Sequence, residues 1–442
     1  MSYVIRRPVW IACIGLLGMT VAASTAEAGG FSIREQSTYG QGAAYAGVAA
    51  GGALSSMFWN PAVMTQIPGI QSESSLTGIL PYSSNNATSG AGIGTGNVAH
   101  EALVPSGYFS WQIRPQLWLG MSVNSPYGLT ETFPDAWSGR PYGAGGDHLT
   151  TFNATPSIAY ALTDWLSIGA GVQIQYADAT LTKGIGALLA NQVSITGKGW
   201  GYGWTAGVTV RPTPTTTIGI GYRSAIDQNI DGSLLLPAGP LFSPPFSTPG
   251  SVSTTLHLPD TVSIGIRQKL GAQWTAMGTV EWSNWSRIGT SNVVQPNGQP
   301  AVVLNGLGGG AVAIPFEYKD GWYFSIGAEY QWTEKFAVRG GIGFEKSPIS
   351  DAVRIPIVAD NDRTWLSLGA TYQYSDRLSF DVAYSHLFVK STPIDITSSS
   401  NPSFNGAAYT GTVDSRIDLV SVALHYRWDT PARTSKGPMY VK

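Results

Sequence analysis

The sequence has few charged residues for its length. Asp, Glu, Lys and Arg make up 12% of its 442 residues, about half of the roughly 25% usual in soluble proteins. The 25 basic and 27 acidic residues leave a formal charge of −2, which argues against nucleic-acid binding because no basic surplus is present. Aromatic residues make up 11%, and this share together with the low charge excludes intrinsic disorder.

Cysteine and long apolar runs are scarce as well. The single cysteine, Cys13, lies in an apolar run over residues 9–23 that follows two arginines. At about 15 residues the run is shorter than the roughly 20 that a membrane-spanning helix needs. A small-x-small site ends at Ala28, so residues 1–28 are predicted to be a secretory signal peptide cut after Ala28. No later stretch has 18 consecutive apolar residues, which excludes a helical membrane span.

A period-two alternation is the main pattern that the sequence does contain. In residues 322–332 every second residue is apolar, and the residues between them are mostly polar or small. Such alternation predicts strands with one apolar and one polar face. The polar face carries Gly, Ser, Thr and Gln rather than Lys and Glu, which favours a wall around an enclosed lumen over a secreted sandwich or propeller. Six tryptophans near strand ends suit the aromatic girdles of a membrane barrel: Trp111, Trp118, Trp165, Trp274, Trp332 and Trp428.

Fourteen candidate strands follow one another from residue 69 to residue 428. Short turns alternate with long loops near residues 127–148, 183–198, 231–251, 288–317, 347–362 and 391–414. An even strand number and this turn pattern are typical of a bacterial outer-membrane barrel. The predicted fold is therefore an all-β, 14-stranded antiparallel transmembrane β-barrel over residues 69–428, with a periplasmic tail at residues 429–442.

Residues 29–68 do not alternate and are rich in Gly and Ala. They could form an exposed periplasmic arm or a plug inside the barrel. A lumen enclosed by fourteen strands leaks unless something fills it, so a plug is the preferred interpretation.

Several short stretches together resemble the FadL-type outer-membrane transporters. That family carries long-chain fatty acids and, in its toluene-transporter branch, aromatic hydrocarbons. The stretches are Gly29–Phe31, Gly40–Gly47, Asn60–Ala62 after Met57–Trp59, Asn124–Leu129 with Phe133–Arg140, and Gly221–Ser224 with Leu256–Thr261. They occur in family order over most of the mature chain.

The resemblance implies an N-terminal hatch and a lateral exit. The hatch plugs the barrel, with Asn60, Pro61 and Ala62 as hatch residues and Phe31 reaching the ligand pocket. Without the resemblance, the Asn-Pro-Ala stretch would be read as a turn, because Pro fixes φ. The family's third strand is kinked and lets substrate leave sideways into the membrane. Candidate kink residues are Gly120 and Pro126, since Gly packs no side chain and Pro donates no ladder hydrogen bond.

Capture in the family occurs in an apolar groove between two outer loops. The corresponding loops at residues 183–198 and 231–251 offer the candidate substrate-binding residues Leu188, Leu189, Leu235, Leu236, Leu241, Phe242 and Phe246. The first loop has spacings compatible with a short amphipathic helix. Exposed apolar residues on an outer loop indicate a ligand or lipid contact, but these loops could equally pack on themselves.

Arg223 is the candidate for holding a fatty-acid carboxylate, because it lies in the polar register of its strand and would form charge-assisted hydrogen bonds. The alternative is a structural ion pair with a lumen acid, either Glu281, Glu329 or Asp381.

No enzyme signature is present. The sequence has no HExxH motif, no G-x-S-x-G motif and no Cys/His cluster, so neither catalytic residues, a metal site nor a cofactor is predicted. The run Asp360-Asn361-Asp362 is interpreted as a polar loop tip. The expected function is transport of fatty acids or hydrocarbons by a monomer in contact with outer-membrane lipid. The alternatives are a general diffusion porin and a surface receptor or adhesin barrel.

Overall fold

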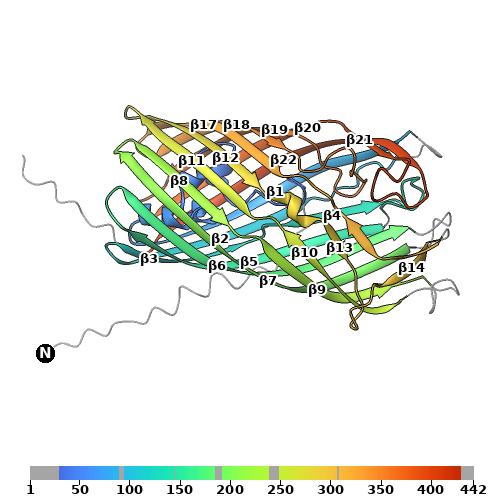
Figure 1. The fold of residues 1–442 in the computed structure, drawn as a ribbon. Coiled ribbons are helices and arrows are strands. Elements are labelled where there is room, and N and C mark those ends of the chain that lie inside the picture. Colours follow the sequence, from blue (N-terminus) through green and yellow to red (C-terminus); the bar gives the residue numbers. More distant parts are fainter. Residues whose placement is uncertain are drawn as a thin grey trace, which may run out of the picture.

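The structure, a computed structural model, describes residues 29–88, 94–143, 145–184, 192–237, 248–305 and 308–429. These residues form a closed antiparallel β-barrel that encloses a set of short helices (Figure 1). The predicted signal peptide, residues 1–28, and the tail beyond residue 429 lie outside the described residues. Within them, no helix is long and apolar enough to cross a membrane.

Fourteen strands make up the described barrel wall, as predicted. Ten are single segments: β1 (Ile70–Ala87), β2 (Ala102–Arg114), β5 (Gly145–Ala161), β6 (Leu166–Gly184), β7 (Gln192–Thr213), β12 (Trp274–Ser283), β17 (Gly321–Thr333), β18 (Phe336–Lys346), β19 (Arg363–Gln373) and β22 (Tyr409–Arg427). Four strands are interrupted and consist of two segments each: β3 (Leu117–Asn124) with β4 (Gly128–Phe133), β8 (Thr216–Arg223) with β9 (Ile226–Leu235), β10 (Gly250–Leu258) with β11 (Thr261–Leu270), and β20 (Leu378–Val389) with β21 (Thr392–Ile396).

The barrel closes between its first and last strands. β1 pairs with β2 on one side and with β22 on the other, where Gln71 lies opposite Arg427. Tight turns join the strands at this end of the barrel, and long connections join them at the other (Figure 1). The longest connection contains η6 (Trp285–Ile288) and two small hairpins, β13 (Thr290–Asn292) with β16 (Ala313–Pro315) and β14 (Val302–Asn305) with β15 (Gly308–Ala311).

Four expected outer loops are shorter than predicted, among them 391–414, which contains β21 and the start of β22. β4 and the start of β5 occupy part of 127–148, β7 begins at residue 192 inside the first capture loop, and β9 continues to residue 235 inside the second. In these strand ends apolar residues such as Leu129, Val193 and Leu234 are buried, so the strand ends lack the outward apolar face by which the membrane-embedded strands were recognised. Backbone pairing extends the wall there without such a face.

The wall is apolar outside and polar inside. On β17, Trp322, Phe324 and Ile326 are 39%, 43% and 71% exposed, whereas Tyr323 and Ser325 are buried. This inverted burial suits a barrel whose outer face meets lipid. The expected aromatic girdle is wrong for Trp118. It is buried because it lies in the inward-facing register of β3 with Ser122 and Asn124, and its indole N–H donates to the carbonyl of Ile67 at 2.8 Å. The other five girdle tryptophans are exposed.

The N-terminal residues before β1 fill the lumen as a plug, as predicted. The plug contains α1 (Thr38–Gln41), η2 (Val48–Ala50), η3 (Leu54–Phe58) and η4 (Pro61–Gln66), and most of its residues are buried. Its apolar side chains form a core with inward-facing residues of the wall, including Tyr108 and Trp365.

Wall glycines let the plug backbone touch the barrel directly. A Cβ atom on Gly221 would overlap the carbonyl of Trp59, and one on Gly219 would overlap the carbonyl of Ala49. Only glycine permits such a close approach between backbones. Part of the chain's high glycine content, 54 residues, is therefore explained by the fit between plug and wall.

Candidate functional site

The third barrel strand is interrupted at residues 125–127, between β3 and β4. β3 pairs with β2 and β5, whereas β4 pairs with β5. We call the first plug residues, 29–36, the strap. They occupy the hydrogen-bonding position that the break leaves free on the wall. The N–H of Ile33 donates to the carbonyl of Pro126 at 2.8 Å, and the N–H of Gly128 donates to the carbonyl of Phe31 at 2.9 Å. The strap thus pairs with the wall where the strand's own ladder stops.

Gln36 fastens the other end of the strap to the same place. Its side-chain amide donates to the carbonyl of Ser125 at 2.8 Å and accepts from Asn124 at 3.1 Å. The hydroxyl of Tyr108 donates to the carbonyl of Gln36 at 2.5 Å. All four residues are buried, so the break is covered from the lumen side.

The two predicted kink residues have different surroundings. Pro126 lies in the break, where its missing N–H leaves no ladder bond to lose. Gly120 lies within β3 in regular register, opposite Ser110 of β2 and Ser157 of β5. A Cβ on Gly120 would meet Met57 and Met64 of the plug, so this glycine makes room for the plug and not for a kink.

An aromatic cluster surrounds Phe31. Its ring lies 4.9 Å from the ring of Trp285, 6.1 Å from that of Phe316 and 6.2 Å from that of Tyr127, measured between centroids. Phe31 is 3% exposed. Ring contacts of this kind add to the stabilisation from burial, and they hold the strap beside the break.

An apolar pocket of about 120 Å³ lies between Phe31 and the loop end of the barrel. Strand ends and outer connections supply its wall, including Leu149 of β5, Leu181 of β6, Leu256 of β10 and Ile357. Most of the apolar lining residues belong to the larger of the two outer apolar cores.

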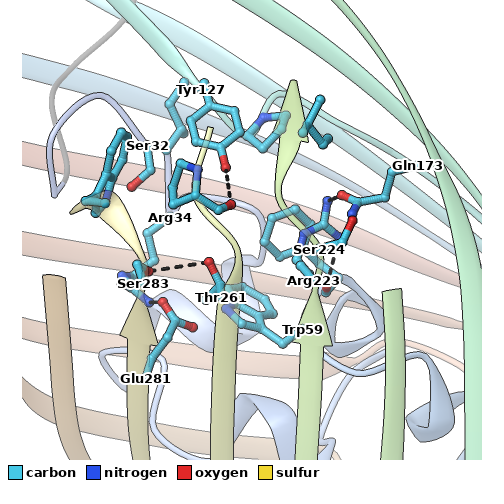
Figure 2. A pocket seen from close by; sticks show the side chains of 16 residues that line it. Ser32, Arg34, Trp59, Tyr127, Gln173, Arg223, Ser224, Thr261, Glu281 and Ser283 are labelled. Carbon is cyan, nitrogen blue, oxygen red and sulfur yellow. Dashed lines mark hydrogen bonds and ion pairs between the residues drawn. The ribbon is translucent and has the colours of Figure 1, made fainter. Parts of the chain in front are cut away.

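Figure 2 shows a second, polar pocket of about 60 Å³. Its lining includes Arg34 of the strap and, from the wall, Gln173, Arg223 and Glu281. Tyr127 and Trp285 line it as well, while their ring neighbour Phe31 lines the apolar pocket. The aromatic cluster therefore separates the two pockets. Pro126 also lines the polar pocket, which places this pocket against the strand break.

Arg223 reaches the polar pocket from the end of β8. Its guanidinium donates to the carbonyl of Phe58 at 3.0 Å and to the side-chain oxygen of Gln173, and it stacks over the Phe58 ring at 4.1 Å. These contacts connect wall and plug.

The alternative ion pairs considered for Arg223 are wrong. Glu281 pairs with Arg34 at 2.8 Å, and the other two lumen acids pair with Arg339 and His425. Among the described residues, no carboxylate oxygen lies within 4.0 Å of the Arg223 guanidinium. The cation therefore lines the pocket without a carboxylate partner.

A buried ion cluster lies beside the strap. Arg34 contacts Glu281 at 2.8 Å and Glu345 at 3.5 Å, and Arg363 contacts Glu345 at 3.8 Å and also Asp360. Each side chain is at most 9% exposed. The interpretation of Asp360-Asn361-Asp362 as a polar loop tip is wrong for Asp360. This residue is 1% exposed, because its connection folds inward and pairs it with Arg363.

The predicted hatch residue Asn60 fastens the plug to the wall. Its side-chain amide donates to the carbonyls of Ala49 in the plug and Val208 in β7, at 2.7 and 3.0 Å, and its oxygen accepts from the N–H of Ala62 at 3.0 Å. Asn60 is thereby the N-cap of η4, with Pro61 in the first turn, a favourable place for both residue types.

The predicted capture residues are only partly described. Leu235 is 56% exposed at the end of β9, and Leu236 packs on a small apolar cluster that includes Leu234. The short helix expected in the first loop cannot extend past residue 191, because β7 begins at Gln192. Five predicted residues lie outside the described residues: Leu188, Leu189, Leu241, Phe242 and Phe246.

Sequence reasoning missed Tyr127, Trp285, Glu345 and Asp360 as parts of the site. Glu345 had a usable signal, since it occupies the polar, lumen-facing register of its strand. The other three lie in connections without periodicity, where no local pattern reports the direction of a side chain.

Comparison with known proteins gives consistent results. The family described as "Outer membrane protein transport protein (OMPP1/FadL/TodX)" matches residues 19–428. The long-chain fatty acid transport protein of Escherichia coli strain K12 is 25% identical over 428 residues, covering 86% of this chain and 92% of that protein. The 47 kDa outer membrane protein of Pasteurella multocida is 31% identical over 396 residues, covering 84% and 89%.

Solved structures share the fold. A Pseudomonas aeruginosa FadL homologue superposes with a TM-score of 0.80 at 22% identity, covering 90% of this chain and all of that one. The toluene transporter TbuX of Ralstonia pickettii gives a TM-score of 0.64 at 18% identity, covering 89% and 98%.

Proposed function

The chain belongs to the outer membrane protein transport protein family (OMPP1/FadL/TodX), and from this premise we propose that it moves hydrophobic molecules through its lumen and out sideways at the break in strand three. It is a β-barrel of the bacterial outer membrane and a transporter of hydrophobic compounds, not an enzyme. The proposal concerns the route: the apolar pocket, the Phe31 cluster, the polar pocket and the strand break, in that order.

One observation carries this route. The side chain of Phe31 lines the apolar pocket, while its carbonyl accepts the hydrogen bond from Gly128 at the break. A ligand that displaces the ring must move the backbone that covers the break. Binding and opening are thus coupled through a single residue.

Lateral exit suits the chemistry of a hydrophobic ligand. Exposing apolar surface to water costs about 25 cal/mol per Å². A ligand that leaves an apolar pocket through the wall enters lipid and avoids this cost, whereas one that leaves through an aqueous pore does not.

The pocket volume bears on ligand size. At about 120 Å³, the apolar pocket is of the order of the roughly 150 Å³ cavities that bind benzene. A small aromatic hydrocarbon therefore fits with little rearrangement, whereas a long acyl chain needs the Phe31 ring to move aside. The relatives named as fatty acid and toluene transporters carry the two corresponding classes of substrate.

Arg223 is proposed to hold the carboxylate of an acidic ligand. It lines the polar pocket and has no carboxylate within 4.0 Å among the described residues. A carboxylate there would gain charge-assisted hydrogen bonds. Arg223 and the apolar pocket lie on opposite sides of Phe31, so a ligand that binds at both places needs a polar head group and an apolar tail.

Uptake assays with Arg223→Gln test this assignment. Gln keeps a donor for the Phe58 carbonyl but removes the charge, and Arg223→Lys serves as the matched control that keeps it. Losing a hydrogen bond to a charged group, worth about 1.5–3 kcal/mol, should lower oleate binding roughly 10- to 100-fold and leave toluene uptake unchanged. An equal effect on both substrates would remove carboxylate binding as the role of Arg223.

The rival function, a general diffusion porin, is separated by conductance. A planar-bilayer recording of the intact protein should show little ion current, and deletion of residues 29–62 should raise it strongly. Free conduction by the intact protein would refute the plugged-transporter proposal.

A further inference from the structure

We propose that signal-peptide removal creates a structural cation: the α-ammonium group of Gly29 enters the buried ion cluster and pairs with Glu345, anchoring the strap across the lumen. The inference rests on cleavage after Ala28 and goes beyond the transport route. It assigns a binding site for the processed chain end within the protein itself.

The position of Gly29 supports the pairing. A Cβ on Gly29 would lie 2.6 Å from Oε1 of Glu345. The nitrogen of a residue lies roughly 2.5 Å from its own Cβ by standard geometry, so the Gly29 nitrogen is at most roughly 5 Å from this oxygen. At such a separation an opposite charge stabilises an ammonium ion. The next N–H, that of Gly30, donates to Oδ2 of Asp360 at 3.1 Å.

The backbone here suits glycine alone. Gly29 and Gly30 have φ values of +43° and +73°, in the region that other L-residues rarely adopt. A Cβ on Gly30 would also lie 3.1 Å from the Trp285 ring. The Gly-Gly start therefore lets the chain end pass between Trp285 and Glu345.

The charge of the cluster gives a second, independent argument. Its ion pairs join three carboxylates, those of Glu281, Glu345 and Asp360, to two guanidinium groups, those of Arg34 and Arg363. These five groups carry a net charge of −1 in a buried site, which is costly unless a cation balances it. The carboxyl of Glu35, which interacts with Arg34, Arg363 and Glu345, adds no charge while it is protonated, and one ammonium ion then makes the cluster neutral.

The anchor gives the strap two fixed ends. Glu345 belongs to β18, the eleventh barrel strand, whereas the break lies in the third, nearly opposite in a ring of fourteen. The strap is held by Glu345 and Asp360 at Gly29 and Gly30, and by the backbone of residues 126–128 at Phe31 and Ile33. A ligand that displaces Phe31 therefore pulls against an ion pair, and the anchor sets the threshold for uncovering the break.

The test is labelling of the N-terminal amine with 2-pyridinecarboxaldehyde on detergent-purified protein without substrate. The rate in the folded protein should be at least tenfold below that of the urea-unfolded chain. Glu345→Gln should raise it at least fivefold, and Glu334→Gln, on an exposed turn, should leave it unchanged. Because Glu345 also pairs with Arg34 and Arg363, a second variant inserts one alanine between Ala28 and Gly29. It moves the ammonium and alters no side chain of the cluster, and its labelling should rise as much.

Several outcomes would overturn the proposal. The proposal fails if the wild-type N-terminal amine is labelled at the rate of the unfolded chain. It also fails if the amine of the insertion variant is labelled as slowly as that of the wild type. Mass spectrometry of the purified chain must show Gly29 as the first residue, since any other start leaves no ammonium at this place. None of these readouts uses a transported molecule, so failure here is distinguishable from failure of the transport route.

Discussion

Replacing Phe31 by Ala should uncover the break in strand three without loosening the barrel. Phe31 is buried against three aromatic rings, and truncating a buried Phe to Ala costs about 3–5 kcal/mol. This loss of free energy destabilises the docked position of the strap and not the barrel, because the wall strands do not depend on the Phe31 ring. With about 3 kcal/mol lost and a factor of ten for each 1.4 kcal/mol, the undocked strap becomes roughly 100-fold more populated.

Hydrogen exchange of two amides reports this change. The N–H groups of Ile33 and Gly128 are protected by the hydrogen bonds between strap and wall, and local opening governs their exchange. Their protection should fall roughly 100-fold in Phe31→Ala, while the central amides of β5 keep theirs. Phe152→Ala removes the same ring from the lipid-facing side of β5 and should leave both amides unchanged. Protection of Ile33 within threefold of the wild type, or an equal loss in β5, would refute the coupling of Phe31 to the break.

Two further predictions concern the contact between plug and wall and the pH dependence of strap docking. Gly221→Ala places a methyl group against the carbonyl of Trp59, so it should displace the plug and raise the planar-bilayer ion current. In the control Gly278→Ala, the methyl group meets its nearest neighbour at 3.5 Å, and the current should stay at the wild-type level. Equal currents in the two variants would contradict the close fit between plug and wall. Burial raises the pKa of Glu35 from 4.5 to about 7, so its contribution to strap docking is complete below pH 4.5 and is lost as the pH rises through 7. The hydrogen-exchange protection of the Ile33 amide, corrected for intrinsic exchange, should therefore fall between pH 5 and pH 8 in the wild type. If a Glu35→Gln variant shows the same fall, the Glu35 carboxyl is excluded as its cause.

Local patterns in the sequence were sufficient to predict the barrel and the presence of a plug, but not the contacts between them. Alternation depends only on neighbours along one strand, so residues 322–332 show their two faces without any other part of the chain. The ion cluster cannot be seen in this way, because it joins Arg34 to Glu345 and Arg363 from opposite ends of the sequence. Residue type also misled at Trp118: a tryptophan suggests the girdle, but this one shares the inward-facing register of Ser122 and Asn124, and its indole N–H donates to a plug carbonyl.

The contact between wall glycines and plug carbonyls has a consequence for the permeability of the outer membrane. Backbone lies against backbone at Gly219 and Gly221, so the bulk of the plug has no side chains at these points that could swing aside. Only the eight-residue strap ahead of α1 is placed to move with a ligand. If transport follows the proposed route, a hydrophobic molecule crosses the wall by displacing the strap while the rest of the plug keeps the lumen filled.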